Sequence, residues 1–109
     1  MMRGLRPIPA RLLADDAVVR VPDGDGGYAE GVAVSHVRFA RTQGVVDDDH
    51  RSADAGSGKV YVDAVNSDGA FEVPAGSRID ISGNSYYVAE VKRCEDFNGH
   101  IHHWELVVR

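Results

Sequence analysis

The sequence predicts an all-β fold: a small β-barrel of about six strands with an extended N-terminal tail and one long central loop. Short runs rich in valine and isoleucine follow one another at close spacing, and glycine-rich turns separate them; the 109 residues include 12 glycines. No segment repeats its apolar residues with the period of an amphipathic helix. A chain of this length can form one domain around a single core.

The first residues are expected to form a tail (1–14) ahead of the barrel domain (15–109). In the tail a proline on each side of Ile8 enforces an extended path, and the residues that follow suffice for one short helical turn. Ile8, Leu12 and Leu13 are apolar and need a surface to cover. We expect them to contact either their own domain or a neighbouring subunit or partner.

Several segments have the composition and pattern of strands, with the bounds 17–21, 28–39, 59–65, 78–82, 85–91 and 101–108. In the second segment, alternation places Val34 and His36 on one face and Val37 on the other. The fourth and fifth segments form the clearest hairpin, closed by a Gly83-Asn84 turn. Any two-residue turn near Gly83 brings these apolar side chains to one face: Ile79, Ile81, Tyr86 and Val88.

One segment, Thr42 to Gly58 (loop 42–58), breaks the strand pattern. Its charged centre is the run Asp47, Asp48, Asp49, His50 and Arg51. A segment of this length without periodicity inside a small domain is usually functional or disordered, although a charge cluster is often only a solvated loop. We expect function in this loop.

The overall charge and the cysteine count exclude several classes of protein. The formal net charge is -5, whereas a general nucleic-acid binder needs a basic face to displace counterions. The single cysteine, Cys94, excludes a scaffold held together by intrachain disulfides. We find no signal-peptide pattern and no apolar run of bilayer length, and we expect a soluble protein made in a cytoplasm.

Three histidines near the C-terminus raise the hypothesis of a metal-dependent enzyme. On a strand, His100 and His102 point to one side and His103 to the other, so that only two of them could share an ion. We interpret all three as ordinary strand residues near a turn. The sequence therefore predicts no metal site, no cofactor and no catalytic residue.

Other motifs with possible chemistry fail at specific positions. Residues 23–25 open like a calcium loop, but Tyr28 stands where that loop requires glycine. Residues 56–59 imitate the end of a phosphate-binding loop, but Val60 stands where the hydroxyl residue is needed. Cys94 has histidines nearby, yet a lone cysteine at a strand end is more often simply packed. These failures favour a structural protein over an enzyme.

Three motifs occur in a recognisable order. They are RPIPARLL at residues 6–13, the hairpin IDISGNSYYVAEV at 79–91, and the closing strand IHHWELVV at 101–108. Together they resemble the phage minor capsid proteins of the head-to-tail connector kind, in which a similar His-His-Trp-Glu-Leu forms the final strand. The resemblance covers almost the whole chain, and loop 42–58 matches only in being long and polar.

The resemblance implies a stopper or head-completion protein in the neck of the virion, made in the host cytoplasm. Such proteins form a homo-oligomeric ring, six- or twelve-fold, below the portal or adaptor protein and above the tail terminator or tail-tube protein. Loop 42–58 would project into the DNA channel and close it after packaging. Viral DNA would pass without sequence-specific binding, because acidic loops repel phosphates. No membrane contact is implied.

Two other functions stay open at this point. The first alternative to the preferred stopper role is a connector adaptor or a tail terminator protein. The strands and aromatic residues of the chain also fit a stand-alone β-barrel module that binds a small ligand or a peptide.

Overall fold

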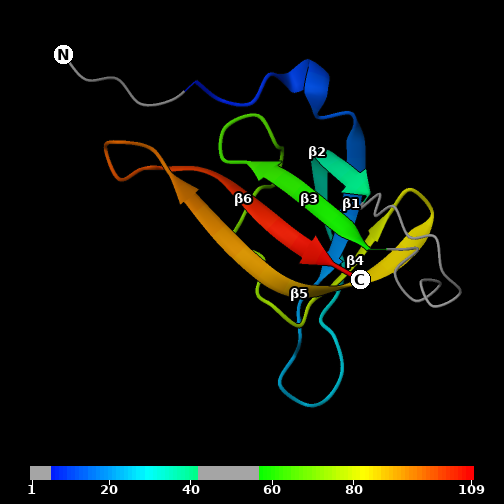
Figure 1. The fold of residues 1–109 in the computed structure, drawn as a ribbon. Coiled ribbons are helices and arrows are strands. Elements are labelled where there is room, and N and C mark those ends of the chain that lie inside the picture. The colour runs from blue at the N-terminus through cyan, green and yellow to red at the C-terminus, as the bar shows by residue number, and fades with distance from the viewer. Residues whose placement is uncertain (1–5, 42–56) are drawn as a thin grey trace, which may run out of the picture.

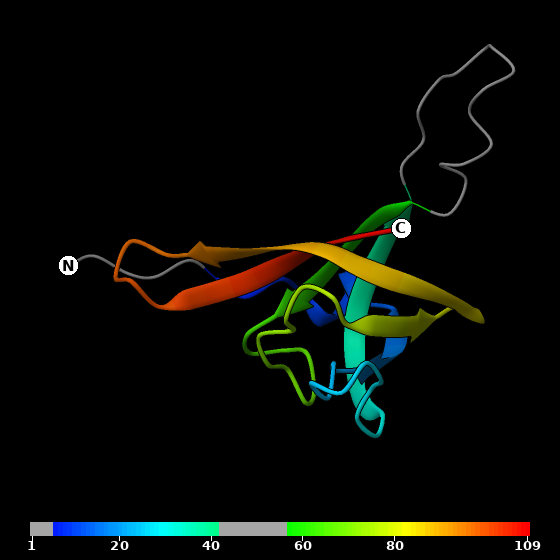
Figure 2. The same cartoon turned by 90° about the horizontal axis from the view of Figure 1, so that it is seen from below.

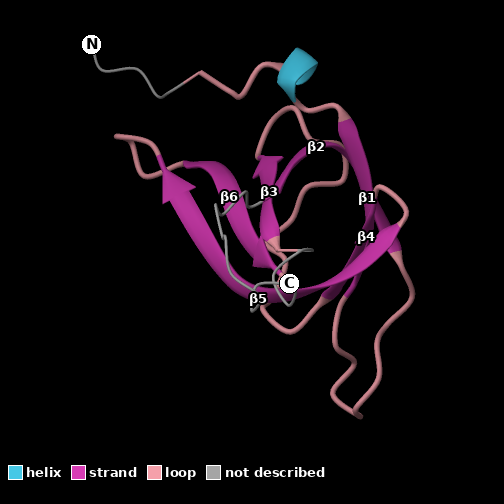
Figure 3. Cartoon of the chain, turned by 45° about the vertical axis from the view of Figure 1, so that its right-hand side comes forward, coloured by secondary structure: helices cyan, strands magenta, loops and turns pink. Residues whose placement is uncertain are grey.

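The structure is a computed structural model that describes residues 6–41 and 57–109 (Figure 1). Its elements are η1 (Ala10–Leu12), β1 (Asp15–Arg20), β2 (Val32–Arg41), β3 (Gly58–Asp63), β4 (Arg78–Ile81), β5 (Asn84–Glu95) and β6 (Ile101–Val108). The strands form a closed barrel in the order β1-β2-β3-β6-β5-β4, and every neighbouring pair is antiparallel. Figure 3 shows the strands surrounding one interior. The predicted all-β barrel is confirmed.

The core consists of the side chains that alternate toward the barrel interior. The period of two is plain in β3, β4 and β6, where every second residue is buried. Each aliphatic side chain removed from water stabilises the fold by about 1.5–3 kcal/mol. The strand residues of this cluster are Ala17, Val19, Val34, Val37, Val60, Val62, Ile79, Ile81, Tyr86, Val88, Trp104, Leu106 and Val108.

Strand β2 departs from the alternation that its sequence predicts. Val34 and Val37 were expected on opposite faces, but both are buried in the core. The cause is a β-bulge against β1, where Asp15 pairs with Val37 and Asp16 with Ser35. His36 is the extra residue and adopts a left-handed backbone with φ of 60°. Because one residue is skipped, the two valines return to the same side.

The β4–β5 hairpin has the predicted inward face, but its turn lies one residue earlier than predicted. Ile81 pairs with Asn84, so Ser82 and Gly83 form the turn and Asn84 already belongs to β5. Both turn residues have positive φ, 53° and 79°. A two-residue hairpin of type I′ requires this conformation, because its twist matches that of the flanking strands.

The remaining strand bounds differ from the sequence prediction by a few residues at most positions. Strand β6 has the predicted bounds, whereas β2 starts later and β5 extends further than expected. The first residues of the β1–β2 connection form a plain turn, in which the Asp23 carboxylate accepts hydrogen bonds from the N–H groups of Asp25 and Gly27. In the described part of the chain, no helix is long and apolar enough to cross a membrane.

Candidate functional site

The β5–β6 hairpin extends beyond the rest of the barrel (Figure 2). At its tip the Asp96 carboxylate accepts hydrogen bonds from the N–H groups of Asn98 and His100, at 2.8 and 3.0 Å. These bonds close the turn without the histidine ring. Phe97 at this tip is 75% exposed, which makes it the most exposed large hydrophobic residue of the described chain. This side chain is therefore free to contact another molecule.

The two ends of the β3–β6 pair carry different features. At one end Gly58 pairs with both Arg41 and Val108, so the segment between β2 and β3 leaves and rejoins the barrel at one place. At the other end Asp63 pairs with His103, close to the start of the hairpin tip. Val65 lies in the turn directly after this end and is 69% exposed. The most exposed apolar side chains therefore gather at the end opposite to the central loop's anchor points.

The N-terminal residues predicted as partner contacts lie along the outside of β2 and β3. Ile8, Leu12 and Leu13 line one groove of about 510 Å³ together with strand residues Arg38, Ala40 and Tyr61. Leu13 is buried by its own chain, Ile8 is half-buried, and Leu12 is 44% exposed. Of the three, Leu12 thus offers the largest free apolar surface to a neighbour.

A buried carboxylate fastens this N-terminal segment to the barrel. Asp63 is fully buried at the end of β3, and its Oδ1 accepts a hydrogen bond from the Ile8 N–H at 2.9 Å. Its Oδ2 accepts from the N–H groups of Val65 and Asn66. The Asn66 side-chain amide donates in turn to the Ile8 carbonyl at 2.8 Å. The buried charge is therefore satisfied by backbone donors, as a buried carboxylate requires.

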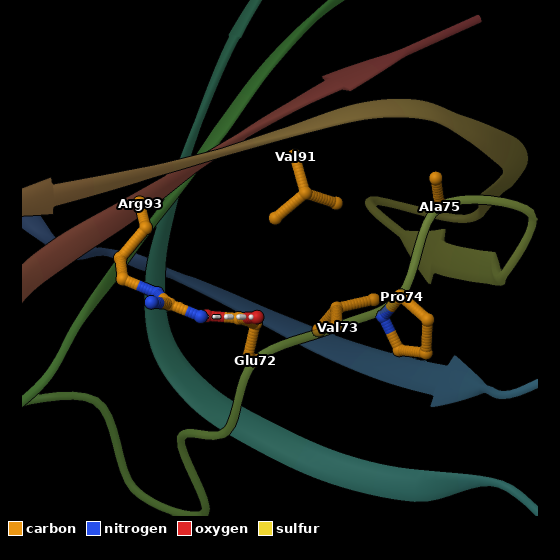
Figure 4. A pocket seen from close by; sticks show the side chains of 6 residues that line it. All are labelled: Glu72, Val73, Pro74, Ala75, Val91 and Arg93. Atoms are coloured by element: carbon orange, nitrogen blue, oxygen red, sulfur yellow. Dashed lines mark hydrogen bonds and ion pairs between the residues drawn. The ribbon is translucent and has the colours of Figure 1, made fainter.

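A second groove, of about 310 Å³, lies between β5 and the extended segment that precedes β4 (Figure 4). Glu72 closes it by a double contact with the Arg93 guanidinium, at 2.6 and 2.9 Å. The Trp104 indole N–H donates to the same carboxylate at 3.0 Å. The hydrogen bonds from Arg93 and Trp104 hold the pKa of Glu72 at about 2. The ion pair of Glu72 and Arg93 thus joins the two walls of the groove, which are β5 and the segment before β4.

At the base of the projecting hairpin, the structure assembles a polar cluster that the sequence did not predict. Cys94, His103 and Glu105 place one possible ligand atom each within 4.8 Å of one another. The His103 Nε2 lies 3.1 Å from Glu105 Oε2, and the Cys94 thiol lies 3.6 Å from the same oxygen. Burial raises the pKa of the Cys94 thiol, and the hydrogen bond with His103 lowers the pKa of Glu105.

A second β-bulge explains why the histidine prediction was wrong in its geometry. Cys94 pairs with His103 and Glu95 with Ile101, so His102 is an extra residue in β6. The rings of His102 and His103 consequently meet, with their Nδ1 atoms 2.7 Å apart, instead of pointing to opposite faces. His100 is exposed near the hairpin tip and is not one of the three clustered residues. Only a register shift between paired strands reveals this arrangement, and the sequence carries no signal of it.

The predicted DNA-channel residues of the central loop lie outside the described residues. They are Asp47, Asp48, Asp49, His50 and Arg51. Their assignment stays a prediction from the sequence, as do the domain bounds 1–14 and 15–109. What the structure adds is the position of the segment's anchor points, Arg41 and Gly58.

Taken together, the strands define a small all-β barrel subunit with exposed apolar side chains at one end. Residues 18–108, most of the chain, match the family described as Minor capsid protein. The chain belongs to this family, and its role is therefore structural, in a bacteriophage particle. No curated protein and no solved structure matches the chain.

Proposed function

We propose that this minor capsid protein is a head-to-tail connector of the stopper or head-completion kind. Its subunits would form a homo-oligomeric ring in the neck, between the portal or adaptor protein and the tail terminator or tail-tube protein. The observation that carries the proposal is the division between the two ends of the β3–β6 pair. The acidic loop is anchored at one end, by Arg41 and Gly58, and the apolar tips Val65 and Phe97 lie at the other.

This division suits a subunit that must meet DNA on one side and protein on the other. An acidic segment near DNA repels phosphates and favours passage over adhesion. The net charge of -5 is consistent with a wall along which DNA slides. Closure of the channel by loop 42–58 is then steric, through loops that meet at the ring axis.

A closed ring needs two different surfaces on each subunit, because its interfaces are heterologous. The chain offers one candidate for each of these two surfaces. Leu12 lies on the outside of β2 and β3, whereas Phe97 lies on the projecting hairpin tip. A hairpin that reaches beyond its own barrel can contact the groove of a neighbouring copy.

Deletion of residues 44–56 in the phage tests the gating role. We expect the isolated barrel to stay folded, because the deleted residues lie between paired strand ends, and packaged heads to lose their DNA. Replacing Asp47, Asp48 and Asp49 by asparagine is the matched control, since it keeps the length of the loop and removes its charge. If closure is steric, heads with the asparagine variant retain DNA. Heads that retain DNA after the deletion would show that the loop does not gate.

A reconstruction of the assembled neck tests the connector role separately. We expect a ring of this chain directly next to the portal or its adaptor, with the β2–β3 connection toward the axis. A ring at the top of the tail tube would instead identify a tail terminator, and a ring separated from the tail by a second connector ring would identify an adaptor. Density elsewhere in the capsid shell would overturn the connector proposal itself.

A further inference from the structure

We propose that Cys94, His103 and Glu105 form a binding site for a divalent transition-metal ion of the zinc class. The three residues come from two paired strands, β5 and β6, at the base of the projecting hairpin. Their possible ligand atoms all lie within 4.8 Å of one another. The side chains of His103 and Glu105 are 17% and 19% exposed, so an ion can reach the site while most of its surroundings are protein.

The hydrogen bonds around His103 supply an independent argument for a cation. The Arg6 carbonyl can only accept, so the His102 Nε2, 2.5 Å away, carries a hydrogen and donates it. The Nδ1 atoms of His102 and His103 lie 2.7 Å apart, and one of them must donate to the other. Two neutral rings supply one hydrogen each, and these two contacts use both.

No hydrogen is then left for the contact between His103 Nε2 and Glu105 Oε2, which are 3.1 Å apart. A ring lone pair and an ionised carboxylate would face each other there, and two acceptors repel. One positive charge between them resolves the conflict. A metal ion supplies this charge, and the neighbouring Cys94 sulfur supports that assignment because a thiolate binds such ions strongly.

The chemistry of the three donors selects the class of metal. A thiolate, an imidazole and a carboxylate together suit Zn²⁺, whereas Mg²⁺ and Ca²⁺ prefer sites made only of oxygen atoms. Binding would release the Cys94 thiol proton to solvent, with no change of oxidation state. Water would complete a tetrahedral site. Lys59 Nζ lies 3.5 Å from the other carboxylate oxygen, Oε1, and leaves Oε2 free for the ion.

His102 would orient the metal ligand without touching the ion. Metal-bound histidines usually donate their second ring N–H to a neighbouring acceptor, which fixes the ring. Here His103 Nδ1 would donate to His102, and His102 to the Arg6 carbonyl. The ion would thereby lock the base of the hairpin and, through His102, the start of the described N-terminal segment.

Metal binding to the purified full-length chain, without a histidine tag, tests the site. We expect one Zn²⁺ per chain, measured by competition with a chromophoric chelator, and a thiolate charge-transfer band with Co²⁺. Cys94→Ser should abolish the band and weaken Zn²⁺ binding more than His102→Ala, for which we expect a loss of about 10–100-fold with the band retained. His100→Ala, the matched control at the hairpin tip, should bind like the unaltered chain.

Alkylation of the unaltered chain gives a second measurement that does not depend on any variant folding. Cys94 is the single cysteine, and saturating Zn²⁺ should slow its reaction with iodoacetamide severalfold if the thiolate is a ligand. An unchanged alkylation rate, or a Cys94→Ser variant that binds Zn²⁺ as tightly as the unaltered chain, would overturn the proposal. Binding lost in His100→Ala would equally overturn it, because the ion would then sit at the tip.

Discussion

The carboxylate of Asp63 joins the end of β3 to the backbone of Ile8, 55 positions earlier in the chain, through a hydrogen bond of 2.9 Å. The Asn66 side chain strengthens this junction by donating to the Ile8 carbonyl. The N-terminal segment is therefore held on the barrel by polar contacts as well as by its apolar side chains. Because Ile8 and Leu12 line one groove, Asp63 also sets the position of the surface that we propose for subunit contacts.

Replacing Asp63 by alanine should destabilise the fold and release the N-terminal segment. The partly buried N–H groups of Ile8, Val65 and Asn66 would lose their acceptor, and each loss costs about 1–3 kcal/mol where water cannot replace it. Urea denaturation followed by Trp104 fluorescence measures the free energy of unfolding. Limited trypsin digestion should show faster cleavage after Arg11.

Asp68→Ala is the matched control for this change. The Asp68 side chain is 75% exposed and contacts the His36 ring at the surface, so its loss should cost less than about 0.5 kcal/mol. Equal losses of stability for the two variants would contradict the role assigned to Asp63.

Truncation of two neighbouring leucines to alanine should change the stability of the isolated chain by very different amounts. Leu13 is 1% exposed, and Leu13→Ala should lower the free energy of unfolding of the isolated chain by about 2–5 kcal/mol. Leu12 is 44% exposed, and Leu12→Ala should change it by less than about 0.5 kcal/mol. If Leu12 contacts a neighbour, its variant should instead fail in ring assembly. A Leu13→Ala chain as stable as the unaltered one would show that the segment does not pack as described.

Acid should weaken the barrel partly through Glu72. The Arg93 and Trp104 hydrogen bonds lower the pKa of Glu72 from 4.5 to about 2 on folding. A carboxylate whose pKa is lower in the folded state adds stability that is fully present above the unfolded pKa. This contribution should disappear as the pH falls from 4.5 to about 2. The midpoint of urea denaturation, measured at several pH values in this range, should fall as this contribution is lost.

Glu72→Gln should flatten the pH dependence of stability in that window, because the variant has no carboxylate to protonate. The Trp104 emission should also stop shifting with pH there, since its indole N–H contacts residue 72. Glu90→Gln, an exposed residue of the same strand as Arg93, serves as the control and should keep the original pH dependence. An unaltered profile in Glu72→Gln would assign the acid sensitivity to other groups.

The β4–β5 turn should be sensitive to backbone conformation alone. Gly83 has φ of 79°, and a Cβ there would meet no atom within 4 Å. Gly83→Ala should therefore cost about 1 kcal/mol from strain without any clash. Ser82→Asn should instead stabilise the hairpin slightly, because asparagine tolerates the φ of 53° at Ser82 better than serine does. Thermal unfolding of both variants checks the opposite signs; a neutral Gly83→Ala would contradict the assigned turn.

The sequence determined the fold class and most of the core. Alternating apolar residues define an inward face wherever a strand is regular, as at Ile79 and Ile81 or at Leu106 and Val108. The three motifs also identified the minor capsid family, to which the chain belongs. These features depend on local pattern, and a local pattern can be read along the chain.

Only the tertiary structure decided where that alternation fails and which distant groups meet. The bulges at His36 and His102 each add one residue to one strand of a pair, which depends on the register of the partner strand. The first turns Val34 and Val37 to one side, and the second brings His102 onto His103. Closure of the barrel likewise brings Asp63 to Ile8 and Cys94 to Glu105, because strand pairing fixes the distance between residues that the sequence leaves far apart.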